Sequence, residues 1–201
     1  MAAIWVLASY LLGSIPFGLW IARRFAGVDI TAAGSGNIGS TNVMRVCGPR
    51  LAIVVFLLDV LKGFVPPFIV FHAGMAPSVI IMAAMAAIIG HNFSVWLGFR
   101  GGKGIATSLG ALLGVSPLVG VSALAVFLLA VLVVRYISVG SILAAISLPV
   151  FMPIYYPHDL WRLGFASLAG VMALIKHRAN IGRLLKGTEP RLNLRRRIAR
   201  D

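Results

Sequence analysis

Long apolar runs alternate with short polar segments along the whole chain. Seven runs carry almost no charge, and they cover residues 3–21, 51–71, 79–97, 105–115, 118–134, 137–155 and 160–175. A helix needs about 20 apolar residues to cross a bilayer, and most of these runs approach that length. The pattern predicts an all-α, polytopic integral membrane protein with a single membrane-embedded domain over 1–201.

The stretch 105–134 allows two interpretations, because Ser116-Pro117 is its only break signal. As one helix it would be about 45 Å long, and as two it would contribute two short crossings. With two crossings there are seven helices, and 16 of the 18 Lys and Arg residues then face the cytoplasm. With one crossing, Arg135 and the basic tail would lie outside. The excess of basic residues in cytoplasmic segments therefore favours seven transmembrane helices.

The same charge distribution predicts the orientation of the chain. Residues 1–22 carry no charged side chain, whereas Arg23 and Arg24 follow the first run. This order is typical of a retained first helix rather than of a signal peptide. We therefore expect the N-terminus outside and the C-terminus, with a basic tail over 190–201, in the cytoplasm.

Composition narrows the chemistry. The chain is 60% hydrophobic and 11% charged, against about 45–50% and about 25% in soluble domains. The net charge of +13 follows from the cytoplasmic segments, so we expect no nucleic-acid partner. Five carboxylates and four scattered histidines predict neither a metal site nor a cofactor. Cys47 has no partner for an intrachain disulfide.

The first polar segment that could carry function covers 34–42 and is followed by Arg45. It contains glycines at 34, 36 and 39, but the dinucleotide fingerprint of that spacing requires a preceding strand, and here a membrane helix precedes it. Closely spaced glycines can turn backbone N–H groups toward an anion, and Ser, Thr and Asn add donors. The alternative is a flexible polar loop.

The second segment, 90–107, places several glycines and Lys103 at the start of an apolar helix. It is no Walker loop, because Leu97 and Gly104 occupy positions that such a loop reserves for Gly and for Ser or Thr. A helix N-terminus offers free N–H groups and partial positive charge, which suits a phosphate. The alternative is a tight turn with a lysine that follows the positive-inside rule.

The third segment, 176–189, carries the last helix out of the membrane. His177, Asn180 and Leu184 share one helical face. A basic flank of a membrane helix would explain the lysines and arginines here, but not the His and Asn on one face. Within the second apolar run, Asp59 and Lys62 are spaced to pair, and a structural ion pair facing the bundle is the favoured interpretation.

Together these segments bring basic residues next to glycine turns on one side of the membrane. The residues are Arg45, Arg100, Lys103, Arg178 and Arg183. The pattern indicates an anionic, phosphorylated substrate at the membrane surface. Acyltransferases that use CoA esters are excluded, because they require an Asp five residues after a His, and none of the four histidines has one. A shortage of clustered Asp residues excludes the CDP-alcohol phosphotransferases.

The three segments resemble the cytoplasmic motifs of the acyl-phosphate-dependent glycerol-3-phosphate acyltransferases, the PlsY family. They read SGNIGSTNVMR at 35–45, GHNFSVWLGFRGGKGIAT at 90–107 and HRANIGRLLKGTE at 177–189. The Asp59–Lys62 pair followed by Gly63 is also similar to that family. The resemblance covers nearly the whole chain, and Ser94 departs from it where proline is expected.

This resemblance implies the transfer of a fatty acyl group from acyl phosphate to sn-glycerol 3-phosphate, giving lysophosphatidic acid and phosphate. That reaction is the first step of phospholipid synthesis in many bacteria. The implied partners are the two substrates and membrane lipids, and the implied location is the bacterial plasma (inner) membrane with the active site facing the cytoplasm.

The resemblance also implies roles for individual residues. The catalytic set is Ser35, Lys103, His177 and Asn180; the substrate-binding set is Asn37, Arg45, His91, Gly101, Gly102 and Gly104; and the structural set near the site is Asp59, Lys62 and Glu189. The general base is open between His177 and the phosphate of the donor. A membrane transporter of a phosphorylated solute is the alternative function, and it predicts polar groups near the bilayer midplane. A non-catalytic lipid-binding subunit is a third possibility.

Overall fold

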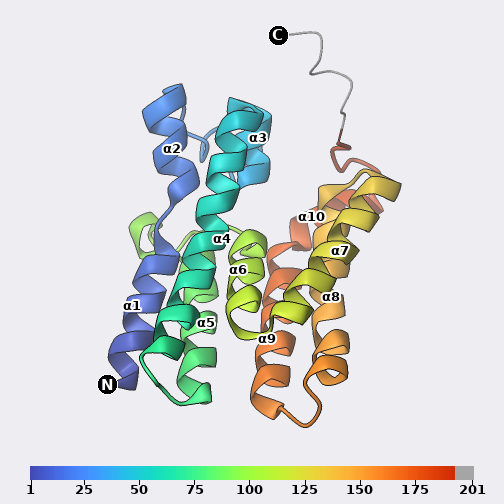
Figure 1. Ribbon diagram of the computed structural model, residues 1–201. Coiled ribbons are helices and arrows are strands. Elements are labelled where there is room, and N and C mark those ends of the chain that lie inside the picture. Colours follow the sequence, from blue (N-terminus) through green and yellow to red (C-terminus); the bar gives the residue numbers. More distant parts are fainter. Residues whose placement is uncertain (193–201) are drawn as a thin grey trace.

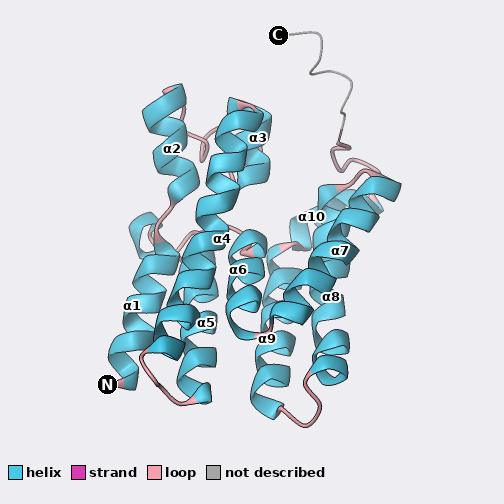
Figure 2. Ribbon diagram, in the orientation of Figure 1, coloured by secondary structure: helices cyan, strands magenta, loops and turns pink. Residues whose placement is uncertain are grey.

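The computed structural model describes residues 1–192, and within that range every regular element is a helix (Figures 1 and 2). The elements are α1 (Ala2–Ser14), α2 (Phe17–Ala26), α3 (Ser40–Cys47), α4 (Pro49–His72), α5 (Pro77–Asn92), the short 3₁₀ helix η1 (Val95–Leu97), α6 (Ile105–Val115), α7 (Pro117–Val134), α8 (Ile137–Tyr155), α9 (Leu160–Lys176) and α10 (Arg178–Leu185). The predicted all-α class is confirmed. Most of the basic tail expected over 190–201 lies outside the described residues.

All seven apolar runs are helical, with the first divided into α1 and α2. Among residues 1–192, five stretches are both long and apolar enough to cross a membrane. They are Ala2–Ala26, Pro49–His72, Pro77–Leu97, Pro117–Val134 and Ile137–Tyr155. Helix α6 has 11 residues and α9 has 17. At 1.5 Å per residue, α6 spans about 16 Å, roughly half of a hydrocarbon core of about 30 Å. The protein is thus a multi-pass membrane protein, whereas the number seven stays a prediction.

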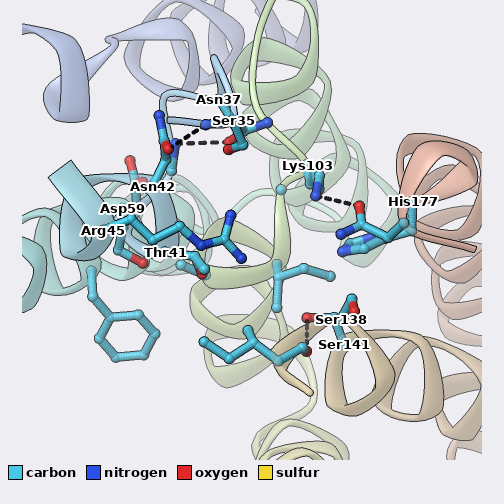
Figure 3. A pocket seen from close by; sticks show the side chains of 18 of the residues that line it. Ser35, Asn37, Thr41, Asn42, Arg45, Asp59, Lys103, Ser138, Ser141 and His177 are labelled. Carbon is cyan, nitrogen blue, oxygen red and sulfur yellow. Dashed lines mark hydrogen bonds between the residues drawn. The ribbon is translucent and has the colours of Figure 1, made fainter. Parts of the chain in front are cut away.

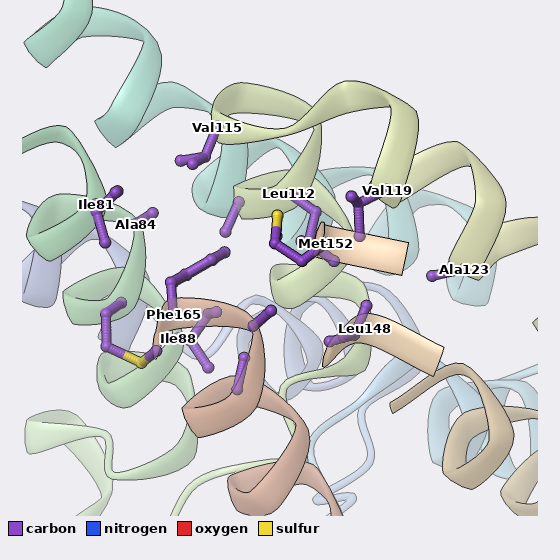
Figure 4. Packing of buried hydrophobic residues seen from close by; sticks show 14 residues of the cluster. Ile81, Ala84, Ile88, Leu112, Val115, Val119, Ala123, Leu148, Met152 and Phe165 are labelled. Atoms are coloured by element: carbon purple, nitrogen blue, oxygen red, sulfur yellow. The ribbon is translucent and has the colours of Figure 1, made fainter. Parts of the chain in front are cut away.

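The long helices run up and down in two groups (Figure 1). Helices α1, α4, α5 and α6 pack on one another, and α7, α8 and α9 form the second group. Buried apolar side chains from α5, α6, α8 and α9 join the groups, among them Ile88, Leu112, Met152 and Phe165 (Figure 4). Helices α2 and α3 extend beyond the other helices at the end opposite the N-terminus, beside the first turns of α4 (Figure 1).

Glycines set the spacing of the first group. A Cβ at Gly63 would overlap the backbone of Thr107, and one at Gly110 would overlap the carbonyl of Val60, so α4 and α6 touch backbone to backbone. Gly13 and Gly90 do the same where α1 crosses α5. Small residues at such crossings let membrane helices approach closely.

The first membrane helix is broken at Ile15-Pro16, where two carbonyls lose their helical donors. The Lys62 ammonium donates to the Ile15 carbonyl at 2.8 Å and lies 2.7 Å from Asp59, and the buried Ser94 hydroxyl donates to the Ser14 carbonyl at 2.6 Å. An unpaired buried carbonyl is costly. The break therefore accounts for a lysine inside a span and for a serine where the resemblance led us to expect proline.

Arg162 binds a free carbonyl in the same way as Lys62, at the C-terminal end of the short helix α6. Its Nε donates to the Val115 carbonyl at 3.1 Å, and its Nη1 pairs with Asp159 at 2.5 Å. Lys62 and Arg162 are the two of the 18 basic residues that lie outside the predicted cytoplasmic segments, and each of them donates to a carbonyl at a helix end.

Candidate active site

The three polar segments meet around one cavity of about 140 Å³ (Figure 3). The first segment contributes Ser35, Asn37, Thr41, Asn42 and Arg45; the second contributes His91, Lys103 and Gly104; the third contributes His177, Asn180, Arg183 and Glu189; and Asp59, Ser138 and Ser141 complete the polar lining. All four residues of the predicted catalytic set are therefore brought together.

The loop at 34–39 is shaped by Asn42, which lies buried in the first turn of α3. Its Oδ1 accepts the Ser35 N–H at 2.8 Å, and its Nδ2 donates to the Ile30 and Ala33 carbonyls at 2.9 and 3.1 Å. Asn37 Oδ1 accepts the Gly39 N–H at 2.9 Å. These side chains bend the loop so that Ser35 lines the cavity. The position of Asn42 in the motif at 35–45 gave no indication of this structural role.

The second loop is built against the end of α5. The Gly102 N–H donates to the His91 carbonyl at 3.0 Å, and the Gly101 N–H donates to the Asn92 carbonyl at 3.2 Å. Added Cβ atoms at Gly101 and Gly102 would overlap the His91 carbonyl and imidazole. Gly101 and Gly102, two of the three glycines in the predicted substrate-binding set, thus use their amides inside the protein. Gly104, with φ +77°, and Lys103 line the cavity at the start of α6.

A chain of hydrogen bonds crosses the cavity from the second segment to the third. Lys103 Nζ donates to Asn180 Oδ1 at 2.5 Å, Asn180 Nδ2 donates to Glu189 at 2.6 Å, and Arg183 Nε donates to the same carboxylate at 2.7 Å. The Asn180 amide is thereby fixed with its oxygen toward Lys103. Partial burial opposes the charge of Glu189, but the bonds from Asn180 and Arg183 hold the pKa of its carboxyl below the ordinary value.

Burial also tunes the two titratable groups that face the cavity. It lowers the pKa of Lys103 to about 8, with Glu189 opposing the shift and Arg183 and Arg45 adding to it. It lowers the pKa of His177 to about 4, against the hydrogen bond to the Ala173 carbonyl and with help from Lys103. His177 Nδ1 lies 2.8 Å from that carbonyl. Since a carbonyl only accepts, Nδ1 carries the proton, and the neutral ring keeps Nε2 as an acceptor.

Part of the lining escaped the sequence analysis. Ser138 and Ser141 lie in the first turns of α8, inside an apolar run that gave no sign of a site. Conversely, Arg100 and Arg178 are exposed and do not line the cavity, so the expected cluster of five basic residues is reduced to Arg45, Lys103 and Arg183. Among residues 1–192, no three His, Cys, Asp or Glu side chains come together as a metal site.

An apolar groove of about 410 Å³ adjoins the polar cavity. Its walls come from α4, α6, α7, α8 and α9, and Ser108 and Ser141 are its only polar lining residues within the described chain. Phe56, Ile105, Ala106, Phe127 and Ser141 line both spaces. A molecule with an anionic head and an apolar tail can therefore occupy both at once.

A membrane-embedded helical bundle whose cationic cavity joins an apolar groove defines a class, the integral membrane proteins that act on amphiphilic anions. Comparison with known proteins gives the particular family. A family model described as glycerol-3-phosphate acyltransferase matches residues 3–187. The chain belongs to this family, which confirms the resemblance of its motifs and displaces the transporter alternative.

Individual members of the family match the chain over nearly its full length. The chain is 47% identical over 183 residues to a glycerol-3-phosphate acyltransferase of Geobacter sulfurreducens, covering 91% of this chain and 93% of that one. A Trichlorobacter lovleyi protein of the same name is 44% identical, with 92% and 94% covered. The crystal structure of PlsY (YgiH), an integral membrane glycerol 3-phosphate acyltransferase, in its glycerol 3-phosphate form superposes with a TM-score of 0.89 at 42% identity, covering 96% of both chains. Its lysophosphatidic acid form gives 0.88 at 41% identity.

Proposed function

We propose that this protein transfers a fatty acyl group from acyl phosphate to the 1-hydroxyl of sn-glycerol 3-phosphate, releasing phosphate and lysophosphatidic acid. The observation that carries the proposal is the junction of a cationic cavity with an apolar groove. The cavity suits two phosphates, and the groove suits one acyl chain. The named ligands of the PlsY crystal forms, glycerol 3-phosphate and lysophosphatidic acid, support the acceptor and the product.

Acyl phosphate as the donor fits the chemistry of the site. An acyl phosphate carries a good leaving group, so its carbonyl can be attacked by a hydroxyl without strong activation. The cavity offers charges and hydrogen-bond donors for the phosphate, notably Arg45 and Lys103. Such groups stabilise developing negative charge best where water is excluded.

The resemblance of the motifs and the lining of the cavity support the following roles. Arg45 and Lys103 bind phosphate, Ser35 stands close to the reacting carbonyl, and His177 Nε2 and Asn180 orient the acceptor. The amides at the start of α6, beyond Gly104, hold the donor head. Gly101 and Gly102 instead allow the loop to lie against α5. The base that takes the hydroxyl proton is either His177 Nε2 or the phosphate of the donor.

We further infer seven crossings, an outside N-terminus and a cytoplasmic active site in the bacterial inner membrane. Helices α6 and α7 run in opposite directions, as do the other consecutive long helices of the bundle (Figure 1). The N-terminus and α10 lie toward opposite ends of the bundle, as an odd number of crossings requires. The cavity shares its end with the basic segments, and these stay in the cytoplasm.

Turnover of the purified protein tests the function. Detergent-solubilised protein receives acyl phosphate and glycerol 3-phosphate without metal or CoA ester, and phosphate release is followed. We expect release that needs both substrates and that falls at least a hundredfold in Ser35→Ala and Lys103→Ala, with Lys186→Met, which removes an exposed cation, as the matched control. No release from folded wild-type protein would refute the proposal.

A further inference from the structure

The C-terminal end of α5 gathers partners from three distant parts of the chain. The last carbonyls of a helix have no donor within the helix. Here the His91 carbonyl accepts the Gly102 N–H, the Asn92 carbonyl accepts the Gly101 N–H, and the Phe93 carbonyl accepts the Tyr10 hydroxyl at 2.8 Å. The end of α5 therefore acts as the template on which the second loop of the site is laid.

Lys176, the last residue of α9, also contacts the C-terminal end of α5. Its ammonium donates to the Asn92 carbonyl at 2.5 Å and lies 4.1 Å from the centre of the Phe93 ring. The same carbonyl accepts the Gly101 N–H at 3.2 Å. A lysine that served only to orient the chain in the membrane would need no partner, whereas this one is half-buried and directed at the support of the loop.

We propose that Lys176 is a positioning residue for loop 98–104, the loop that carries Lys103. By holding the Asn92 carbonyl, it fixes the places of Gly101 and Gly102, and thus of Lys103 and the first turn of α6 in the cavity. A cation at the end of a helix is electrostatically favourable, so the contact also stabilises α5. This inference rests on the proposed function, because it treats Lys103 and the first turn of α6, which loop 98–104 places in the cavity, as the binding site of the acyl-phosphate head.

Kinetics of three variants test the proposal. Lys176→Met keeps the apolar stem but removes the charge and the donor, Lys176→Arg keeps both, and Lys186→Met removes a cation whose side chain makes no hydrogen bond or ion pair within residues 1–192. We expect Lys176→Met to raise the KM for acyl phosphate about tenfold, the weight of one charged hydrogen bond. The KM for glycerol 3-phosphate should change less than about twofold.

The pattern of the outcomes decides between roles. Lys176→Arg should restore the donor KM to within about threefold of wild type, and Lys186→Met should match wild type. Unchanged KM values in Lys176→Met overturn the inference. So does an equal rise in both KM values, because that result would mean that the substitution acts through the neighbouring His177 or through general loosening.

Hydrogen exchange gives a readout that needs no turnover. The amides of 98–104 should exchange about tenfold faster in Lys176→Met than in wild type and in Lys186→Met, since Gly101 loses its fixed acceptor. Equal exchange in all three proteins overturns the inference by itself. If wild-type protein shows no turnover, the proposed function fails, and the exchange result still decides whether Lys176 positions the loop.

Discussion

Two glycine-rich loops border the same cavity, but they are held in different ways. The first, 34–42, is shaped from within, since Asn42 and Asn37 bind backbone groups no more than 12 residues away. The second, 98–104, is bonded to the end of α5 through Gly101 and Gly102, and that end is held in turn by contacts from distant helices, Tyr10 of α1 and Lys176 of α9. One loop is a local structure, and the other is a product of tertiary packing. The first should therefore fail through single side chains, and the second through its fit to the bundle.

The largest effect is expected where the second loop presses on α5. In Gly102→Ala the new Cβ overlaps the His91 imidazole, so the loop must move and carry Lys103 with it. A displacement of about 1 Å costs roughly a hundredfold in rate, and we expect kcat/KM to fall by that factor. Gly164→Ala in α9, where the added Cβ meets open space, is the control and should stay within about twofold. Wild-type activity in Gly102→Ala would show that the fit to α5 does not position the loop.

Substitution of Asn42 should disrupt the first loop more than any other single change in it. In Asn42→Ala the Ser35 N–H and two carbonyls lose their buried partner, at a cost of about 1–3 kcal/mol, and Ser35 is released from its position. We expect kcat/KM to fall about tenfold and the free energy of unfolding to fall by about 2 kcal/mol. Asn42→Asp can still accept from Ser35 but cannot donate to the Ile30 and Ala33 carbonyls. Full activity and stability in Asn42→Asp would contradict this account.

The pH dependence of kcat/KM should distinguish the two loops, because the second contains Lys103, whose pKa is lowered toward neutral pH. The pKa of Lys103 is lowered to about 8, so the ammonium is charged below that pH and loses its proton above it. We expect kcat/KM to fall toward a tenfold loss per pH unit above about pH 8, after subtraction of spontaneous hydrolysis. Lys103→Arg keeps its charge and should remove this fall. A wild-type profile that stays flat to pH 10 would contradict the assignment.

The smallest effect is expected at Asn37, which contributes one hydrogen bond to the Gly39 N–H. The loss of a neutral, partly exposed bond is worth about 1 kcal/mol, so Asn37→Ala should lower kcat/KM by at most about fivefold if loop shape is its whole role. A loss as large as that of Asn42→Ala would instead place Asn37 in direct contact with substrate.

The same division explains what the sequence could predict. Continuous apolar runs located the long helices, because a membrane span is a local property of about 20 residues, but they did not predict the division of the first span into α1 and α2. The motifs located Ser35, Lys103, His177 and Asn180, which the structure brings to one cavity. The break at Ile15, the capping roles of Lys62 and Arg162 and the hydroxyls of α8 depend on contacts between distant helices. No spacing along the chain encodes such contacts.

The contact between Lys62 and the Ile15 carbonyl also bears on how the protein is made. As α4 leaves the translocon, it carries the Asp59–Lys62 pair, and a single unpaired charge costs about 2.5–3.5 kcal/mol at the centre of a lone helix. Helix α1 has been synthesised before it, and the break at Pro16 has left a carbonyl ready for Lys62. We therefore expect α1 and α4 to enter the lipid bilayer together, so that these two helices pair during membrane insertion rather than later in folding.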